Sequence, residues 1–317
     1  MYKNLKKVHS ITSKKNISTV YSSMCIRNGA VIGFDGSMTV CVKEDALLGI
    51  NAVIHADKFL KAIGSTDAPK VYTTENFLMV KEGKFQARLP LLNIEFPIQS
   101  PKGSVHDCFG LLSALKAISG FVSQDASHKW ATGCMVKNGY IYATNNVILV
   151  RYKVCEGLPE MNIPAKAVNE LNKINEEPLY LIKRNGGIAF MFEDDWWLDT
   201  ALLDYEWPEV DSMFSTRELP PIHPELVKAV ELVSPFCASG IPKIYFSDKG
   251  VSSDNKDYNS TYEGIDLPVA CFHAHTLAQV LPLMEHVDWK EFPRACPFYG
   301  KQTPTGRLEG VVIGIRI

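Results

Sequence analysis

The segments IHADKFLKAI at 54–63, IPAKAVNELN at 163–172 and FHAHTLAQVL at 272–281 share one pattern. Each has an apolar residue, one further residue, an alanine and then apolar residues at helical spacing. Successive copies start 109 residues apart, because 163 − 54 and 272 − 163 are both 109. Self-similarity at a fixed period predicts that one structural unit occurs three times in the chain.

Two further matches have nearly the same period. LLNIEFP at 91–97 matches LLDYEWP at 202–208 with an offset of 202 − 91 = 111. CIRNGAVIGFDGS at 25–37 matches MVKNGYIYATNNV at 135–147 with an offset of 135 − 25 = 110. Both members of the second pair indicate two strands joined by an Asn-Gly turn, and KIYFSDKGVSSD at 243–254 has the same role in the third copy.

These matches predict three domains, at 1–103, 104–212 and 213–317, with connectors rich in Pro, Gly and Ser. An amphipathic first helix is marked in the second and third domains by apolar residues at helical spacing: Leu111, Leu115, Ile118 and Val122, then Leu226, Val230, Val233 and Cys237. The predicted fold class is α+β, with two helices on a curved antiparallel sheet in each domain. A row of such domains leaves unpaired sheet edges, and head-to-tail closure into a ring removes them.

The composition is that of a globular protein, with 46% hydrophobic and 21% charged residues. The eight cysteines are scattered without a CxxC pair, so we expect reduced thiols, no zinc site and no disulfide framework. No apolar run is long enough for a membrane span, and the basic N-terminus lacks the apolar core of a secretory signal. A cytoplasmic protein is therefore expected. The net charge of −2 is unevenly spread, since residues 1–100 hold 13 Lys and Arg against 8 Asp and Glu.

Three stretches carry a resemblance to a known family: VSQDASHKWATGCMVKNGYIYATNNVILVRY at 122–152, the EFP and EWP ends of the first two repeats, and VVIGIRI at 311–317. The chain resembles the bacterial DNA polymerase III beta subunit, the beta sliding clamp, in a shortened form such as a phage could encode. The resemblance implies a head-to-tail homodimer of three-domain subunits. It also implies a non-enzymatic processivity factor without a cofactor, which encircles double-stranded DNA in a bacterial or phage-infected cell.

DNA contact in such a ring needs only positive charge facing the phosphates, without sequence readout. We expect it from lysines on the helix faces opposite the apolar stripes: Lys6, Lys7, Lys14, Lys15, Lys58, Lys61, Lys116, Lys166, Lys173 and Lys228. The resemblance adds weight to Lys14 and Lys15, which fall where the family has a DNA-contacting arginine region. Any single one of these lysines could instead be an ordinary surface residue.

The resemblance further implies a groove that binds a short linear peptide of the DNA polymerase or the clamp loader. The matching positions are Thr144, Val147, Leu149, Pro220, Val311, Val312, Ile313 and Ile315. The alternative interpretation is that 311–317 is only the last core strand, and both can hold because alternate residues of a strand face opposite sides. Where the family has Asp-Gly-His-Arg, this chain has Asn145, Asn146, Val147 and Ile148, so the polar rim of the groove differs.

Two alternative functions remain open. The acidic run at 193–195 could hold a metal ion in a nucleic-acid-processing enzyme, although a solvated turn is the simpler interpretation. The His273 and His275 pair, near Glu285 and His286, is expected to be structural, because a metal site needs three or four convergent ligands. The thin basic set in the third repeat leaves room for a clamp-like decoy that binds host replication proteins. We expect no catalytic residue and no metal ligand.

Overall fold

The computed structural model describes residues 1–12, 18–98, 100–253, 259–304 and 306–316. The contacts within the chain divide it into two compact units. Unit 1 contains Met1–Leu112, Gly157–Pro159 and Lys166–Asp204, and unit 2 contains the remainder. Because these boundaries cut through the second repeat, the division into three domains stays a prediction. We describe each unit by itself.

Unit 1 holds the whole first repeat. Its elements are α1 (Tyr2–Ile11), β1 (Ser23–Arg27), β2 (Ala30–Phe34), β3 (Met38–Lys43), β4 (Asn51–His55), α2 (Ala56–Gly64), β5 (Lys70–Thr73), β6 (Phe77–Glu82) and β7 (Phe85–Pro90). From the second repeat it holds β8 (Ser104–His106), most of α4 (Ala165–Ile174), β13 (Tyr180–Arg184), β14 (Gly187–Met191) and β15 (Trp197–Ala201). The strands form an eight-stranded sheet, in the order β4-β1-β2-β3-β15-β14-β13-β8, and a three-stranded sheet, β5-β6-β7.

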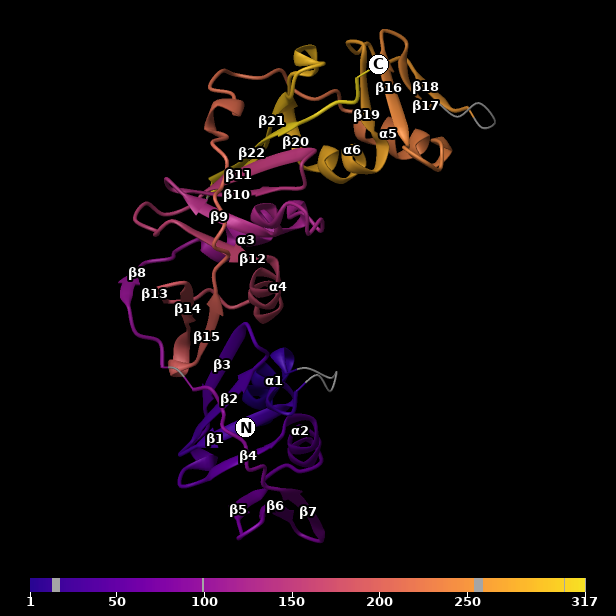
Figure 1. Cartoon of the computed structure of the whole chain (residues 1–317). Coiled ribbons are helices and arrows are strands. Elements are labelled where there is room, and N and C mark those ends of the chain that lie inside the picture. Colours follow the sequence, from indigo (N-terminus) through magenta and orange to yellow (C-terminus); the bar gives the residue numbers. More distant parts are fainter. Residues whose placement is uncertain (13–17, 99, 254–258, 305, 317) are drawn as a thin grey trace. The chain divides into compact units, whose positions relative to one another are not determined.

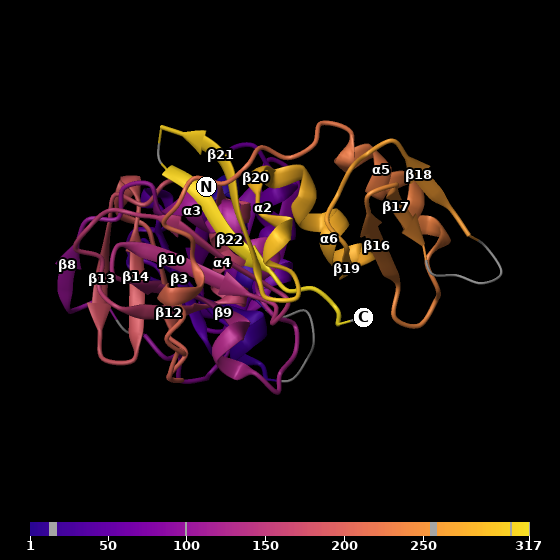
Figure 2. The same ribbon diagram turned by 90° about the horizontal axis from the view of Figure 1, so that it is seen from above.

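Unit 2 holds the rest of the second repeat and the third. Its elements are most of α3 (Leu111–Ile118), β9 (Gly133–Lys137), β10 (Tyr140–Thr144), β11 (Ile148–Lys153), β12 (Met161–Pro164), α5 (Leu226–Val233), β16 (Lys243–Ser247), β17 (Gly250–Ser253), β18 (Thr261–Glu263), β19 (Ala270–His273), α6 (Ala274–Val280), β20 (Met284–Val287), β21 (Cys296–Thr303) and β22 (Gly306–Val312). Seven strands follow the order β12-β9-β10-β11-β22-β21-β20, and four the order β18-β17-β16-β19. Within this unit, Figure 2 shows β16–β19 as a layer apart from β20–β22.

The predicted hairpins are confirmed. Asn28 and Gly29 join β1 to β2 with φ of 46° and 87°, and Asn138 and Gly139 join β9 to β10 with φ of 52° and 75°. Two consecutive residues with positive φ are what a two-residue hairpin turn requires, and Asn-Gly supplies them at low cost. In the third repeat, β16 and β17 flank the expected turn at Asp248.

The predicted second helices are also confirmed, since α2, α4 and α6 begin at Ala56, Ala165 and Ala274. Each helix buries one apolar stripe against its sheet, as Phe59 and Ile63 do in α2. In unit 1, Figure 1 shows α1, α2 and α4 on one side of the strands. Every strand pair in the described ranges is antiparallel, so the predicted α+β class is confirmed.

Two strand pairs join one repeat to the next, which the sequence did not predict. In unit 1, β3 of the first repeat pairs with β15 of the second, with Cys41 opposite Trp197. In unit 2, β11 of the second repeat pairs with β22 of the third, with Arg151 opposite Glu309. Among the described strands, β7 and β18 each end a sheet and have a partner on one side only. The repeats are therefore built to continue into one another through their sheets.

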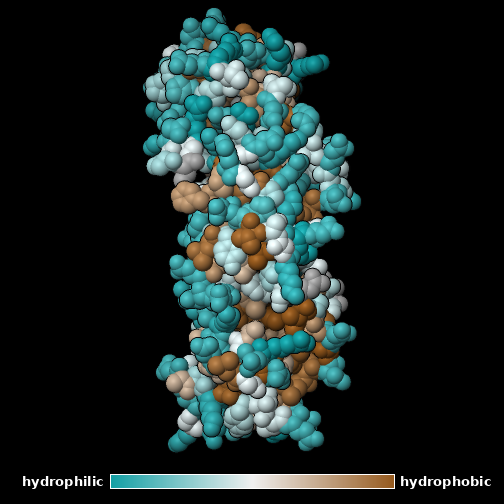
Figure 3. Space-filling view, turned by 90° about the vertical axis from the view of Figure 1, so that its left-hand side faces the viewer, coloured by the Kyte–Doolittle hydropathy of each residue, from teal (hydrophilic) through white to brown (hydrophobic). Residues whose placement is uncertain are grey.

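Apolar side chains also remain at the surface. Figure 3 shows them in patches between polar ones, with one group at the height where Figure 1 labels β1 and β4. At this part of unit 1, the segment after β7 covers the sheet, and Phe96 packs with Cys25 and Trp197 in a buried cluster. Phe96 is the first-repeat counterpart of Trp207, since 207 − 96 = 111. In unit 2, Trp207 likewise packs in a buried cluster, which belongs to the candidate site.

Candidate functional site

A row of side chains crosses one face of the seven-stranded sheet in unit 2. Thr144 lies opposite Leu149, Leu149 opposite Val311, and Val311 opposite Pro297. Residues that are directly opposite in neighbouring strands point to the same face, so this row runs from β10 through β11 and β22 to β21. Three strand spacings make it about 14 Å long. Three predicted groove residues, Thr144, Leu149 and Val311, thus share one face of the sheet, and all three are buried, at 5%, 6% and 1% exposed.

Aromatic side chains cover one side of this row. Trp207 and Phe214, which follow β15 in the chain, pack in a buried cluster with Tyr142, Leu149 and Val311. Trp130 packs edge-to-face against Trp207, with ring centroids 5.0 Å apart and planes at 89°. The Trp207 indole nitrogen is buried and has no hydrogen-bond partner among the described residues. Sequence reasoning expected an aliphatic groove and missed these rings, although the repeated Glu-Trp-Pro motif contains Trp207.

Arg151 fixes the segment that carries these rings. Its guanidinium donates to Glu309 at 2.8 Å and lies 4.2 Å from the centre of the Phe214 ring. Burial acts to lower the pKa of Arg151, but the hydrogen bond and charge of Glu309 outweigh it and raise that pKa. The Tyr142 hydroxyl donates to Asp211 at 2.7 Å. Burial first, and then Asp211, raise the pKa of the Tyr142 phenol, which therefore stays a donor.

A tight loop and the C-terminal tail border the other side of the row. The Thr144 hydroxyl donates to the Ile148 carbonyl at 2.8 Å, and the Asn145 side chain accepts from the Val147 and Ile148 amides. The Ile313 amide donates to the Val147 carbonyl at 2.9 Å. Ile313 is 41% exposed, so an apolar side chain stands at the rim. The structure therefore brings Val147 and Ile313 to the same groove.

The other predicted groove residues lie elsewhere. Val312 is 1% exposed and pairs with Ile148, on the opposite face of the sheet from Val311. The Ile315 amide donates to the Cys271 carbonyl of β19 at 2.7 Å, beyond the groove. The Pro220 carbonyl accepts from the Val287 amide at the outer edge of β20, and β21 separates β20 from β22. These three residues are not brought together with Thr144.

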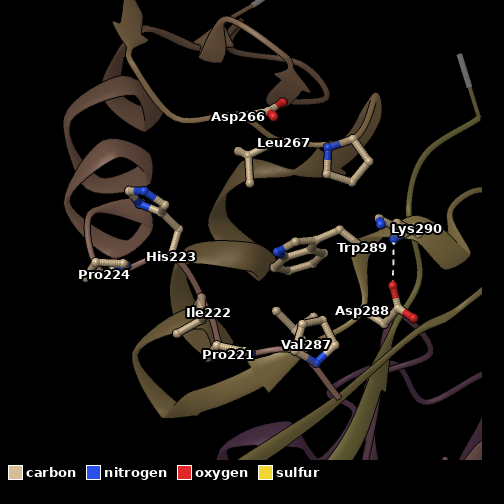
Figure 4. A pocket seen from close by; sticks show the side chains of 12 residues that line it. Pro221, Ile222, His223, Pro224, Asp266, Leu267, Val287, Asp288, Trp289 and Lys290 are labelled. Carbon is tan, nitrogen blue, oxygen red and sulfur yellow. Dashed lines mark hydrogen bonds between the residues drawn. The ribbon is translucent and has the colours of Figure 1, made fainter. Parts of the chain in front are cut away.

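Pro220 instead lines a separate cavity of about 350 Å³. Figure 4 shows the Trp289 indole inside it, between Ile222 on one side and Leu267 on the other. The indole is held edge-to-face against Phe246, with centroids 5.3 Å apart. All the residues that line this cavity belong to the third repeat.

A further cavity, of about 400 Å³, is lined by Pro297, the last residue of the row. Phe214 and Ala295 line this cavity and also pack in or against the aromatic cluster. Two arginines stand at its rim. Arg217 donates to Asp288 and Glu291, both at 2.7 Å, whereas the Arg294 side chain is 85% exposed and lies 3.6 Å from Glu291. Neither arginine was among the residues predicted from the sequence.

The predicted DNA-binding lysines of unit 1 differ in their exposure and in the partners that their side chains contact. Lys7 is only 16% exposed, donates to Glu176 at 3.1 Å and lies 4.0 Å from the centre of the Trp196 ring. Lys58 is exposed on α2. Three others bind carboxylates: Lys61 binds Asp57 at 3.0 Å, Lys166 binds Asp35 at 2.6 Å, and Lys173 binds Glu170 at 2.6 Å. Ion pairs therefore already partner several of the candidates.

The remaining lysines are exposed at the surface. Lys6 lies on α1, 5.0 Å from the centre of the Tyr2 ring. Lys116 on α3 and Lys228 on α5 are exposed. Lys14 and Lys15 lie outside the described residues. The assignment of these lysines to DNA stays a prediction.

The residues considered for metal binding are explained by local structure. The His273 side chain accepts from the Thr276 amide and caps α6. Asp195, in the turn between β14 and β15, binds Lys43 at 2.5 Å. Within the ranges that the structure describes, three or more His, Cys, Asp or Glu side chains do not converge as a metal site. In the same ranges, no helix combines the length and the apolar character that a membrane crossing needs.

Known proteins match this chain by structure and not by sequence. No protein family and no curated protein matches it by sequence. The DNA polymerase III beta protein of Caulobacter crescentus matches with a TM-score of 0.82 over 100% of this chain and 97% of that chain, at 16% identity. This chain has the sliding-clamp fold. The beta subunit from DNA polymerase of Streptococcus pyogenes matches over the same shares with a TM-score of 0.81 and 16% identity.

A sliding clamp of Bartonella birtlesii, in a structure bound to griselimycin, matches with a TM-score of 0.80 and 17% identity, again over 100% of this chain and 97% of that one. The sliding-clamp fold therefore extends over the whole chain. The resemblance seen in the sequence is confirmed at the level of the fold. Because the sequence identity is this low, the resemblance in the sequence is limited to a few motifs and the repeat.

Proposed function

We propose that this protein is a DNA sliding clamp, which encircles duplex DNA and tethers a replicative DNA polymerase to it. The observation that carries the proposal is the match to solved sliding clamps over 100% of the chain. A closed ring needs no catalytic residue, because it raises the effective concentration of a bound polymerase at the template by topology. We expect the protein to act in the cytoplasm of a bacterial or phage-infected cell.

We propose a homodimer that is closed by the edge strands β7 and β18, each of which has a partner on one side only. The third strand of the hairpin region is β3 in the first repeat, β11 in the second and β18 in the third. The last residues of β3 and β18, Lys43 and Glu263, are 220 residues apart, which is two periods of 110. In the first two repeats this strand pairs with the next repeat, as β3 with β15 and β11 with β22. The corresponding strand of the third repeat is β18, and the counterpart of β15 in the first repeat is β7.

The repeat also predicts the register of this contact between copies. Cys41 lies opposite Trp197. Its third-repeat counterpart is Thr261, since 41 + 220 = 261, and the first-repeat counterpart of Trp197 is Gln86, since 197 − 111 = 86. An antiparallel pair with Thr261 opposite Gln86 sets Tyr262 opposite Phe85 and Glu263 opposite Lys84.

The surfaces beside the two strands suit such a contact. Phe85 at the start of β7 is 38% exposed. Leu232 on α5, a helix that packs against β18, is 52% exposed. Lys84 and Glu263 are exposed and carry opposite charges, which favours pairing in this register. Two copies joined in this way bring six repeats into one closed ring.

We propose two partners for this ring. Double-stranded DNA would bind without sequence preference through exposed lysines on the helices. Lys58 on α2 is an exposed example in unit 1. The polymerase and a clamp loader would each dock a short linear peptide into the groove along Thr144, Leu149 and Val311. Because Thr144, Leu149 and Val311 are buried, an extended peptide with apolar anchors would contact this region at its exposed rim, where Ile313 is 41% exposed.

Retention on circular DNA tests the proposed function. The purified protein is incubated with its clamp loader or at high concentration with nicked plasmid, and the plasmid fraction is then isolated by gel filtration. We expect the protein to stay with circular plasmid and to be lost when the plasmid is linearised, because a ring can slide off an end. Equal loss from both forms would contradict a clamp and would favour the decoy alternative.

The enzyme alternative has a separate measurement. Metal-dependent cleavage that disappears in an Asp194→Asn, Asp195→Asn variant would support it. The structural observations favour the clamp over this alternative, since Asp195 is engaged with Lys43 in an exposed turn.

A further inference from the structure

The short strand β8 lies at one end of the eight-stranded sheet of unit 1. Among the described strands it pairs with β13 alone, with Val105 opposite Ile182. A strand at the edge of a sheet directs the backbone N–H and C=O of alternate residues away from its one partner. Gly103 permits the close approach to β13, since a Cβ at this position would collide with the Lys183 carbonyl oxygen. β8 is thus a firmly held edge that a further strand can extend.

Large apolar side chains on and beside β8 are exposed. Val105 is 65% exposed, Phe109 77% and Leu179 55%. Phe109 and Leu179 follow the two residues of one contact, in which the Cys108 thiol donates to the Pro178 carbonyl at 3.3 Å. Figure 3 looks at the side on which Figure 1 labels β8, and it shows apolar side chains at the surface at the height of that label. Exposed apolar groups that gather in this way mark a contact surface.

The polar side chains of β8 already have partners. His106 Nδ1 donates to the Gly157 carbonyl at 3.3 Å, which leaves Nε2 to accept from the Ser104 hydroxyl at 2.8 Å. Alternate residues of a strand point to opposite faces, so Ser104 and His106 lie on one face and Val105 on the other. A residue of an added strand that lies opposite Val105 therefore meets an open apolar side chain, while its neighbours meet polar ones.

The other repeats protect the equivalent edge. In the third repeat, the segment 220–222 lies beyond β20 as β8 lies beyond β13. The Pro220 carbonyl and the Ile222 amide are bonded to β20, so Pro221 is the residue whose backbone faces outward, and proline has no N–H to donate. In the first repeat, the edge strand β5 begins with the exposed Lys70, a charge of the kind that discourages strand addition. β8 has neither a proline nor a lysine.

We propose that β8 is a docking edge for an extended segment of a partner protein, which adds to the sheet with an apolar residue opposite Val105. Backbone pairing gives such a segment its affinity, and its alternate side chains give the specificity. The contact goes beyond the proposed function, because neither the encircling of DNA nor the region around Trp207 uses β8.

The size of the edge favours a short segment over a second copy of this chain. Three strand residues span only about 10 Å. Together with the side chains of Val105, Phe109 and Leu179, they fall short of the roughly 800 Å² that each partner buries in a stable complex of folded proteins. An extended segment needs no more surface than the backbone edge and these side chains offer.

Fluorescence anisotropy with labelled peptides tests the proposal. The probes alternate Thr with Ile, Phe or Ser at the three even positions of a heptapeptide, with a Lys added at each end for solubility. We expect the Ile and Phe peptides to bind about tenfold more tightly than the Ser peptide, as several apolar cross-strand pairs would produce. Two further Ile peptides carry N-methyl groups, one on the Ile amides and one on the Thr amides. Since only one set of amides faces β8, one of these two should lose binding and the other keep it.

Hydrogen exchange and variants locate the bound peptide. A saturating amount of the Ile peptide should slow the exchange of backbone amides in 104–106. Val105→Lys gives β8 the protection that β5 has and should weaken binding about tenfold, and Phe109→Ser should weaken it about threefold. Val269→Lys is the matched control, because Val269 in the third repeat is 66% exposed, and it should leave binding unchanged.

Three results would overturn the proposal. The first is that none of the peptides binds. The second is binding that leaves the exchange of 104–106 unchanged or that Val105→Lys does not weaken. The third is self-association in sedimentation velocity that Val105→Lys removes, which would place a second copy on this edge instead of a partner segment. Retention on circular plasmid is measured separately, so the clamp proposal stands or falls independently of all three.

Discussion

Arg151 of β11 donates to Glu309 of β22 at 2.8 Å, directly opposite each other across the strand pair that joins the second repeat to the third. Both side chains are mostly shielded, at 14% and 16% exposed. Arg151 also stacks 4.4 Å from the centre of Tyr140 and 4.2 Å from that of Phe214. A single guanidinium thus contacts neighbouring strands of one sheet and the segment after β15.

Arg151→Ala is expected to destabilise the protein by about 2–4 kcal/mol, because it leaves the shielded Glu309 carboxylate without its main partner and removes stacking area. Urea unfolding followed by circular dichroism measures the change. Arg294→Ala, at a side chain that is 85% exposed, is the control and should cost less than about 0.5 kcal/mol. A loss below 1 kcal/mol for Arg151→Ala would show that Glu309 finds other partners, of which Arg307 at 3.3 Å is the nearest.

Charge reversal tests the register proposed for the contact between copies. Lys84→Glu and Glu263→Lys should each weaken the dimer, since like charges then face one another across β7 and β18. The two changes combined should restore much of the affinity, which is the signature of a direct pair. Sedimentation velocity over a concentration series gives the dimer dissociation constant. If the double variant is as weak as the sum of the single ones, the two residues do not face each other.

Salt dependence distinguishes the lysines assigned to DNA. Lys58→Gln should reduce the slope of log affinity against log salt by about 0.9, the value for one phosphate contact in duplex DNA. Lys7→Gln should leave the slope unchanged and lower stability instead, because Lys7 is held by Glu176 and Trp196. Anisotropy of a labelled duplex at several salt concentrations measures the slope. A reduced slope for Lys7→Gln would show that its ion pair opens on DNA.

Thiol reactivity follows burial. Of the eight cysteines, only Cys155 and Cys237 are partly exposed among the described residues. Burial raises the pKa of the Cys134 thiol to about 12 and that of Cys41 to about 11. Thiolates react and thiols do not, so the folded protein at pH 8 should incorporate iodoacetamide at two positions and the urea-unfolded protein at eight. Peptide mass mapping identifies them, and rapid labelling of Cys134 would contradict the packing of β9.

His273 makes stability depend on pH. Burial first, and then the neighbouring His275, lower the pKa of His273 below its ordinary value. The unfolded chain then binds a proton at a higher pH than the folded one, so the free energy of unfolding falls as the pH drops below about 6.5. His273→Asn keeps an acceptor for the Thr276 amide and should flatten this fall between pH 6.5 and 5. An unchanged slope would assign the pH dependence to other groups.

The features that local chemistry dictates were predictable from the sequence. The Asn28-Gly29 and Asn138-Gly139 turns and the helix starts at Ala56 and Ala165 follow from residue type and spacing. The joints β3–β15 and β11–β22 were not predictable, because strands that pair across about 150 residues carry no local signal. A single sequence shows that a segment is rich in β-branched residues and so favours a strand, but it does not show which other strand that segment pairs with.

The same limit applies to the candidate groove. Thr144, Leu149 and Val311 were found through motifs and do share one face. Pro220 was grouped with them through the resemblance, but it lies at the outer edge of β20, where its carbonyl accepts from the Val287 amide. The aromatic cover escaped prediction because Trp130 lies in a 3₁₀ helix of four residues and Phe214 directly follows one of three residues, and segments this short show no periodicity.

The edge-to-face pair of Trp130 and Trp207, 5.0 Å apart at 89°, also has an optical consequence. Two indoles so close and so inclined couple their electronic transitions, and the coupling produces a paired positive and negative band in the circular dichroism spectrum. One ring belongs to the turn before β9 and the other to the segment that leaves β15, so the band exists only while those two segments are packed together. The chain thereby carries its own unlabelled spectroscopic signal for the integrity of this face, and Trp130→Phe should remove it while leaving the backbone signal in place.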